Sequence, residues 1–496
     1  MRLFTLLSLL LAWPAYAGSL DAHISDLLTP IAQTLSSFIF HAVPVNGTQF
    51  PLIVGWLILA GIICTLYFRL PQISGFKHAI DLVRGKHPIH GHDTEGVTTH
   101  FQALSMALSG TVGLGNIAGV AVAISIGGAG ATLWMIVAGF FGMAAKFTEC
   151  TLAVKYRERH ADGTVSGGPM YYLSEGLAER GLPRLGKAMA LLFAVCCIGG
   201  SIGAGNMFQS NQAYEQVLLV TGGADSWLAG RGWLFGLVTA TLLGTVIIGG
   251  VQSIANVTSR LVPFMVLLYV GTALYIIAIH VHEIPWALGR IWDGAFTADG
   301  VAGGVIGALI QGFKRAAFSN EAGLGSAAIA HSTVRTPEPA SEGHVALLEP
   351  FIDTIVICTM TALVINITDR VGIPGLTGVQ LTSDAFGSVV SWFPWVLAVT
   401  VVLFAFSTMI SWFYYGLKAL TYLAGHHPAV ELGYKLFFCL CTVVGASLSL
   451  GPVIDFSDAM VFLMAIPNVI GIYLLLPVVR REIDSYRERV IQRNRS

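Results

Sequence analysis

Two short polar, glycine-rich stretches interrupt long apolar segments of this chain, roughly half the sequence apart. The first reads SGTVGLGNIAG over 109–119, and the second reads FSNEAGLGS over 318–326. Glycine costs a helix interior about 1 kcal/mol relative to alanine, and hydrocarbon offers no water to the freed amides and carbonyls. Irregular backbone at membrane depth is typical of a ligand-lined cavity, and a matching pair indicates the site of a secondary transporter. The two stretches therefore predict two broken helices that form one transport site.

Each break offers two helix ends to a ligand. Amide groups at a helix N-terminus suit a carboxylate, and carbonyls freed at the opposite end suit a small cation. The candidate residues are Thr111, Gly113, Gly115 and Asn116 in the first break and Phe318, Ser319, Asn320, Gly323 and Gly325 in the second. Close helix packing is the alternative explanation for the glycines, but polar side chains flank them in both stretches, which favours a binding site.

Three further polar positions lie in other apolar segments. Ser407 and Thr408 are adjacent hydroxyls that can complete a shell of oxygen ligands for sodium, or bond to carbonyls of their own helix. Gln209 can bind a polar ligand or join two helices. Trp412, one helical turn beyond Thr408, can cap a small pocket or simply pack. The residues alone leave these alternatives open.

Ionisable residues inside membrane segments are expensive and usually functional. Lys146 and Glu149 lie three residues apart and can pair on one helix face. Lys314 and Arg315 precede the second break and Glu321 lies within it, where they can gate a vestibule or neutralise one another. Glu149 and Glu321 are also the candidate carriers in a rival hypothesis, a proton-coupled symporter.

The composition predicts an integral membrane protein. It is 54% hydrophobic and 11% charged, against about 25% charged residues in soluble domains. The seven cysteines lie in apolar segments without metal-ligand spacing, so we expect neither a disulfide framework nor a zinc site. No segment combines a nucleophile with a base, which argues against an enzyme. We expect no cofactor other than a coupling ion, no nucleic-acid partner and no obligate protein partner.

The apolar segments predict about eleven transmembrane helices, since a span needs about 20 apolar residues. They lie near 50–68, 98–125, 130–155, 187–220, 233–250, 261–282, 300–333, 345–368, 394–423, 434–450 and 456–478. Residues 1–17 resemble a signal peptide, with Arg2, a short apolar run and Ala15-Tyr16-Ala17 as the cleavage pattern. Residues 479–496 form a basic tail.

The positive charges set the orientation. With the N-terminus outside, the segments predicted inside hold 20 of the 27 lysines and arginines, and those outside hold only Arg231, Arg290 and Arg370. The tail is then cytoplasmic. After the first span, five helices (98–282) start from inside and five (300–478) start from outside. Two five-helix blocks of opposite orientation form an inverted repeat, and each broken segment is the first helix of its block.

The same motifs resemble a known family. FQALS at 101–105, the run GTVGLGNIAG through TECTLAVKYRE at 110–158, and GFKRAAFSNEAGLGSAAIAHS at 312–332 are similar to the alanine/glycine:cation symporters, and the likeness extends over about 50–480. It implies the leucine-transporter fold and sodium-coupled uptake of alanine or glycine. By analogy with neurotransmitter:sodium symporters, Ser407 and Thr408 match a sodium site that carbonyls of Gly110 and Val112 would complete. Gln209 and Trp412 are implied in the substrate pocket by helix order.

The sequence therefore predicts a sodium-coupled symporter of small neutral amino acids that works by alternating access in the bacterial inner membrane. Its ligands are the amino acid and sodium, and its surroundings are membrane lipid. Proton coupling is the first alternative, and a channel is the second. The signal-like start departs from the usual family pattern.

Overall fold

The computed structural model describes residues 30, 33–45, 47–86, 96–160, 165–297 and 304–495. Within them, seven helices are long and apolar enough to cross a membrane, or eight when the bent pair α6 and α7 counts as one span. Two shorter apolar helices, α3 (Leu52–Tyr67) and α12 (Gly232–Ile247), lie beside them. The predicted all-helical membrane architecture is confirmed, whereas the count of eleven spans stays a prediction. The signal-like segment lies outside the described residues.

The first half of the helical body contains the first broken helix. Its elements are α6 (His100–Thr111), η1 (Gly115–Gly119), α7 (Val120–Gly127), α8 (Ala131–Lys155), α9 (Pro169–Glu179), α10 (Pro183–Ile202), η2 (Gly203–Met207), α11 (Phe208–Val220), α12 and α13 (Gly250–Ile279). The two parts of the broken helix meet at 51°. A capping box starts α6. The Thr99 hydroxyl accepts from the Gln102 backbone amide, and the Gln102 side-chain oxygen accepts from the Thr99 backbone amide.

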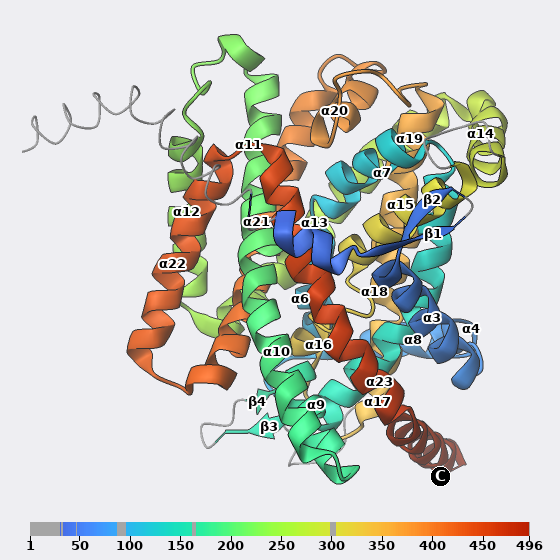
Figure 1. The fold of residues 1–496 in the computed structure, drawn as a ribbon, viewed down its shortest axis with the longest axis vertical. Coiled ribbons are helices and arrows are strands. Elements are labelled where there is room, and N and C mark those ends of the chain that lie inside the picture. Colours follow the sequence, from blue (N-terminus) through green and yellow to red (C-terminus); the bar gives the residue numbers. More distant parts are fainter. Residues whose placement is uncertain are drawn as a thin grey trace, which may run out of the picture.

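The second half contains the second broken helix and the longest helices. Its elements are α14 (Ile284–Phe296), α15 (Gly304–Asn320), α16 (Ala327–His331), α17 (Pro339–Ala346), α18 (Leu348–Pro350), η5 (Phe351–Cys358), α19 (Thr359–Ile367), α20 (Val379–Gly387), α21 (Phe393–Ala424), α22 (Pro428–Ser447) and α23 (Leu450–Arg495). Residues 339–367 act as one span. Figure 1 shows α10 and α23 crossing the middle of the body, with α12 and α22 at one side.

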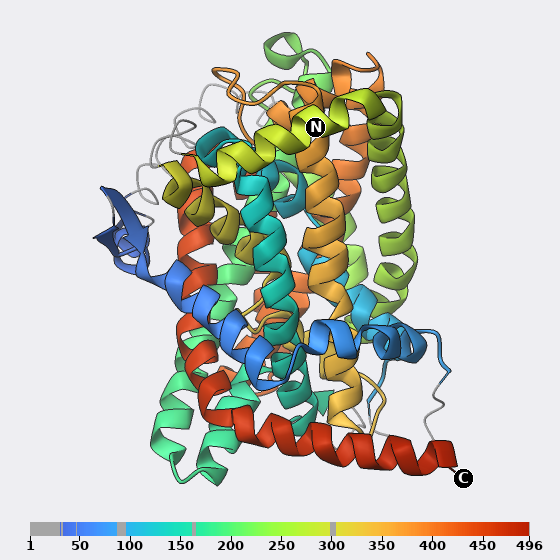
Figure 2. The same cartoon turned by 90° about the vertical axis from the view of Figure 1, so that its right-hand side faces the viewer.

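Helix α23 differs from the predicted division into a span at 456–478 and a separate tail. One helix runs through both parts, and Figure 2 shows its last portion bending to lie along the base of the molecule. Pro467 and Pro477 lie inside this helix, and proline is a common cause of such a bend. The Tyr486 hydroxyl lies 2.7 Å from the imidazole of His78 on α5 (Phe76–Val83), so the tail is attached to the body.

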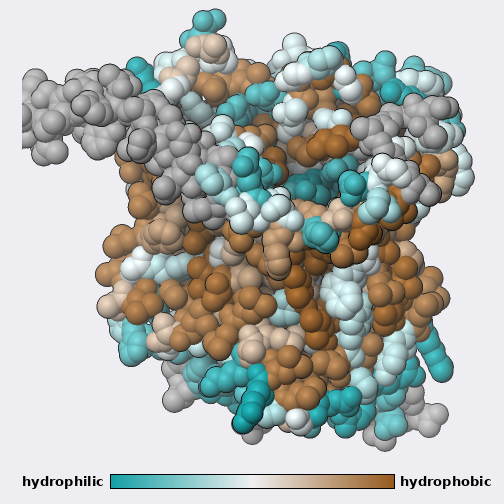
Figure 3. Space-filling view, in the orientation of Figure 1, coloured by the Kyte–Doolittle hydropathy of each residue, from teal (hydrophilic) through white to brown (hydrophobic). Residues whose placement is uncertain are grey.

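Two small strand pairs, which the apolar pattern did not indicate, accompany the helices. Strand β1 (Ala42–Val45) pairs antiparallel with β2 (Thr48–Pro51) just before α3. Strand β3 (Glu158–Arg159) pairs with β4 (Val165–Ser166) after α8. The space-filling view shows hydrophobic residues in a broad band across the molecule, with hydrophilic residues gathered toward its ends, as a bilayer requires (Figure 3).

Glycine also permits close helix packing outside the breaks. A Cβ added to Gly232 would lie 2.2 Å from the Ala446 carbonyl oxygen, and one added to Gly236 would lie 2.6 Å from the Val443 Cα, so α12 packs directly on α22. The packing explanation therefore holds for part of the 56 glycines. The breaks need further evidence.

Candidate functional site

The first break is held open by two side-chain amides. Helix α6 ends at Thr111, and the Gly113 amide donates to Asn116 Oδ1 at 2.8 Å. The Leu114 amide donates to Gln209 Oε1 at 3.1 Å. Because all four residues are buried, these bonds replace the helical ones that the break removes. Asn116 and Gln209 therefore shape the break.

The second break is an irregular turn at residues 321–326. Glu321, Gly323 and Gly325 all have positive φ, at 57°, 85° and 82°. Glycine adopts this conformation without strain, whereas Glu321 is held there by its contacts. Its carboxylate accepts from Trp412 Nε1 at 2.9 Å and from the Ser326 hydroxyl. Trp412 thus anchors the break to α21.

The two breaks meet directly. A Cβ added to Gly115 would lie 3.2 Å from the Ser319 Cα, so backbone approaches backbone at this point. Phe318 packs edge-on against Phe208, with ring centroids 5.4 Å apart. Arg315 lies over the Phe318 ring, with its Cζ 5.1 Å from the ring centroid. Residues from both predicted halves therefore line one region, together with Gln209 of α11.

An aspartate joins the two breaks. Asp353 Oδ1 accepts from Asn116 Nδ2 at 2.6 Å, and its Oδ2 accepts from the Ser319 hydroxyl at 2.9 Å and the Thr354 hydroxyl at 2.7 Å. Its side chain is completely buried in η5. Among the described residues, every side chain that donates a hydrogen bond to this carboxylate is uncharged, so the site has room in its charge balance for a cation.

The hydroxyl pair on α21 divides into two roles. Ser407 donates back to the Phe404 carbonyl at 2.9 Å, which was the alternative explanation for this residue. Thr408 is 1% exposed and its hydroxyl has no hydrogen-bond partner among the described residues. A Cβ added to Gly113 would lie 2.4 Å from this oxygen and 3.2 Å from Gln209 Oε1. The Thr408 hydroxyl therefore points at the first break.

Two further atoms bear on the cation hypothesis. The Tyr415 hydroxyl also lacks a hydrogen-bond partner in the part of the chain that the structure describes, and a Cβ on Gly110 would lie 2.9 Å from it. The Val112 amide still bonds to the Leu108 carbonyl at 2.7 Å, so the helix ends just beyond it. Hard cations prefer oxygen ligands, and this end of α6 faces two buried oxygens that lack partners.

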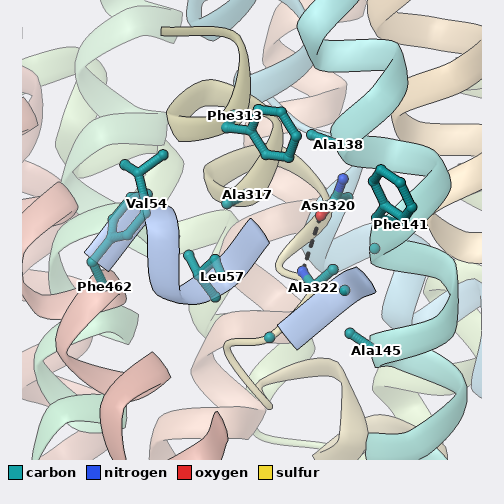
Figure 4. A pocket seen from close by; sticks show the side chains of 13 residues that line it. Val54, Leu57, Ala138, Phe141, Ala145, Phe313, Ala317, Asn320, Ala322 and Phe462 are labelled. Carbon is teal, nitrogen blue, oxygen red and sulfur yellow. Dashed lines mark hydrogen bonds between the residues drawn. The ribbon is translucent and has the colours of Figure 1, made fainter. Parts of the chain in front are cut away.

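Some predicted site residues lie away from the junction of the two breaks. Thr111 bonds back to the Ala107 carbonyl at 3.2 Å. Asn320 donates to the Thr354 hydroxyl at 2.8 Å and accepts from the Ala322 amide, on the side of the break that faces α3 and α8. Figure 4 shows the small cavity there, between α3, α8, α15 and α23.

Gly323 lies on that same side. A Cβ at this glycine would lie 2.5 Å from Leu57 Cδ2 of α3, and its carbonyl accepts from Asn468 Nδ2 at 2.8 Å. The extra N-terminal helix therefore closes the back of the second break. Thr111 and Gly323 make no hydrogen bond to the group around Asp353, and Asn320 reaches Asp353 only through the Thr354 hydroxyl.

The charged residues find partners that the sequence analysis did not name. The suggested pairing of Lys146 with Glu149 is wrong, because Lys146 donates to Glu349 at 3.0 Å and Glu149 accepts from Asn468 at 2.7 Å. Arg315 and Lys314 both bind Asp458 of α23 rather than Glu321. Each pairing joins segments far apart in the sequence, which spacing along one helix does not reveal.

Asp353 is the main residue that sequence reasoning missed. It is an acidic residue in the apolar segment 345–368, and the cost of charge in a membrane would have singled it out. Two hydroxyls behind the first break were also missed: Thr361 donates to the Asn116 carbonyl at 2.8 Å and Thr382 to the Ile117 carbonyl at 3.1 Å. Ordinary threonines in apolar helices carried no signal.

Two broken membrane helices that converge on a buried polar group define the class of secondary transporters. Comparison with known proteins agrees: a model of the sodium:alanine symporter family matches residues 33–496. The chain belongs to the sodium:alanine symporter family. The family's members and this chain's relatives are transporters, so the expectation that it is not an enzyme is confirmed.

Relatives span nearly the whole chain. The sodium/alanine symporter AgcS of Methanococcus maripaludis is 39% identical over 442 residues, covering 88% of this chain and 94% of that protein. The probable sodium/glutamine symporter GlnT of Bacillus subtilis is 33% identical, covering 88% of this chain and 87% of GlnT. The crystal structure of MhsT in complex with L-phenylalanine superposes with a TM-score of 0.57 at 15% identity over 77% of this chain and 89% of MhsT. This likeness supports the predicted leucine-transporter fold.

Proposed function

We propose that this chain carries a small neutral amino acid, alanine or glycine, into the cell together with sodium, by alternating access. The family and the named sodium/alanine and sodium/glutamine symporters support this reading. The observation that carries it is the buried Thr408 hydroxyl, which lacks a hydrogen-bond partner and faces the broken backbone at Gly113. A buried hydroxyl left in this way costs about 1–3 kcal/mol, and a sodium ion would recover that cost.

The proposed sodium ligands are the Thr408 hydroxyl and carbonyls at the end of α6, from Gly110 and Val112. Ser407 is the second hydroxyl of the pair, and its oxygen retains lone pairs while its proton bonds to its own helix. The Ser109 hydroxyl donates to the Ser407 carbonyl at 2.7 Å. That bond fixes α6 against α21, so ion binding would hold the first broken helix to the helix that supplies the hydroxyls.

The proposed substrate site is the region where the two breaks meet. The helical segment that starts at Gly115 borders this region, and a helix N-terminus suits a substrate carboxylate. Asp353 lies between Asn116 and Ser319 and attracts a cation, either the substrate ammonium or a second sodium ion. The close approach of Gly115 to Ser319 and the rings of Phe208 and Phe318 leave little room, which favours a small side chain.

Proton coupling remains the rival, and the structure adds Asp353 to Glu149 and Glu321 as a carrier for it. The Trp412 and Ser326 donors to Glu321 suit an ionised carboxylate and give it a structural role in the second break. We place the protein in the bacterial inner membrane with its C-terminus in the cytoplasm, on the basis of the charge distribution.

The test is uptake of radiolabelled alanine, glycine and glutamine into proteoliposomes, with an inward gradient of sodium or of choline at fixed pH. We expect saturable accumulation of alanine or glycine in sodium only. Equal accumulation in choline would refute sodium coupling and favour a carboxylate as proton carrier. Preference for glutamine would keep the coupling and refute the small substrate.

A further inference from the structure

Five buried ionisable side chains form one connected group near the end of the molecule where α6 begins. They come from five elements: His100 of α6, Lys146 of α8, His331 of α16, Glu342 of α17 and Glu349 of α18. Lys146 Nζ lies 3.0 Å from Glu349 Oε1, and His331 Nε2 lies 3.4 Å from Glu349 Oε2. Glu342 accepts from both histidines, at 2.6 Å from His331 Nδ1 and 2.5 Å from His100 Nδ1. The proposed transport site does not use this group.

The surroundings of the central histidine favour its charged form. His331 Nδ1 bonds to Glu342 at 2.6 Å, and His331 Nε2 lies 3.4 Å from Glu349 Oε2 without making a hydrogen bond. A neutral imidazole has only one N–H, so its second nitrogen would place a lone pair near one of the carboxylates. The imidazolium form places a positive charge between the two carboxylates instead. His331 is completely buried, so no water relieves the wrong arrangement.

The charge balance of the group also favours a proton on His331. With His331 protonated, two positive charges on Lys146 and His331 balance two negative charges on Glu342 and Glu349. Without the proton on His331 the group carries a net negative charge at full burial, which costs several kcal/mol for an uncompensated ion. The closed arrangement therefore retains one proton.

Other ionisable groups surround these five. Electrostatic partners on neighbouring elements are Glu149 and Cys150 of α8, Glu321 of the second break, Asp353 of η5 and Tyr415 of α21. Three of these are further carboxyl groups, and they act on Lys146 and Glu349. His331 is the member of the group whose charge changes near neutral pH when water reaches it.

The group ties both broken helices together. His100 is the first residue of α6, and His331 is the last residue of α16, while Glu342 bonds to both. Separation of α6 from α16 and α17 would break these bonds and admit water. A histidine in water is mostly neutral above about pH 6.5, so the open form would release the proton that the closed form holds.

We infer that His331, with Glu342 and Glu349, is a proton-binding site whose occupancy holds this end of the transporter closed. The inference rests on the proposed alternating access, and it is separate from the coupling ion. The predicted topology places this end in the cytoplasm. Proton binding to the closed form means that closure is favoured at low pH and is lost as the cytoplasmic pH rises.

The test is hydrogen exchange of residues 327–350, measured by mass spectrometry on the full-length protein in lipid nanodiscs with choline and no sodium, from pH 7 to 9. Exchange rates are divided by the intrinsic rate at each pH to give an opening constant. Loss of one proton on opening predicts a rise of about tenfold per pH unit in the unaltered protein. His331→Gln should give a constant that does not change with pH.

The matched control is His344→Gln. His344 is a buried histidine of α17 whose Nδ1 bonds to the Ala340 carbonyl at 2.7 Å, with no carboxylate among its hydrogen-bond partners in the described residues. It should keep the pH slope. Glu342→Gln removes one negative charge and should abolish or shift the slope to lower pH, which covers the case in which His331→Gln does not fold. A flat profile in the unaltered protein, or the same slope in His331→Gln, would overturn the inference.

Uptake measured with the same samples separates the two proposals. A pH slope that persists while uptake ignores sodium supports the proton site and refutes the proposed coupling. Sodium-dependent uptake without any slope refutes the proton site alone.

Discussion

Replacement of Thr408 by valine removes the buried hydroxyl while keeping the shape of the side chain. In the absence of sodium we expect Thr408→Val to be more stable than the unaltered protein by about 1–3 kcal/mol, because a buried hydroxyl without a partner carries a desolvation cost of that size. In saturating sodium this advantage should largely disappear. Loss of one hydrogen-bonding group to a charged ligand costs about 1.5–3 kcal/mol, which weakens sodium binding by roughly ten- to a hundredfold.

The assay is thermal or denaturant unfolding of purified protein in choline and in sodium, with sodium titrated to give its dissociation constant. Thr400→Val is the matched control, since Thr400 lies on the same helix, is 1% exposed and donates to the Val396 carbonyl at 2.8 Å. It should lose a little stability equally in both salts. Thr408→Ser should retain sodium binding. If Thr408→Val lost stability in choline and kept its sodium response, the assignment of this hydroxyl to a cation site would be refuted.

Three further predictions concern the junction of the breaks. Asp353→Asn should lower sodium-dependent uptake at least about tenfold, since it loses charge-assisted hydrogen bonds worth about 1.5–3 kcal/mol; uptake within twofold of normal would contradict its proposed role. Gly205→Ala should abolish uptake, because the new Cβ would lie 2.2 Å from the Trp412 Cβ, whereas Gly244→Ala, with nothing within 4 Å, should transport normally. Trp412→Phe deletes the donor to Glu321 and should raise hydrogen exchange at residues 321–326, and unchanged exchange would argue against that anchor.

The sequence was most informative where local chemistry departs from what a membrane helix allows. Glycines with polar neighbours located both breaks, and hydroxyls at 407 and 408 located the facing helix. The directions of individual side chains were not accessible in this way. Asn320 and Ser319 are adjacent, yet Ser319 bonds directly to Asp353 at the junction, whereas Asn320 lines the cavity beside α3 and reaches Asp353 only through Thr354. Which of these two side chains faces the first break depends on the irregular turn at residues 321–326, which the sequence does not specify.

Ion pairs between segments far apart in the sequence were also not predictable. Lys146 has Glu149 within reach along its helix but binds Glu349, and Arg315 binds Asp458. Such choices follow from how the two halves pack, and charge spacing within one helix carries no information about them. Asp353 differs, because an acid in an apolar segment is visible in the sequence and the rule that charges in membranes are functional would have found it.

The contact between α3 and the second break also constrains how the protein is made. Leu57 is synthesised 266 residues before Gly323, the residue it covers. At about 5–20 residues per second, the first helix waits roughly 13–53 s in the membrane before its partner emerges. During that time its break-facing side is open to lipid or to whatever assists insertion. An early helix of the chain is thus among the last to find its place, and errors of assembly should concentrate at the contact between α3 and the second break.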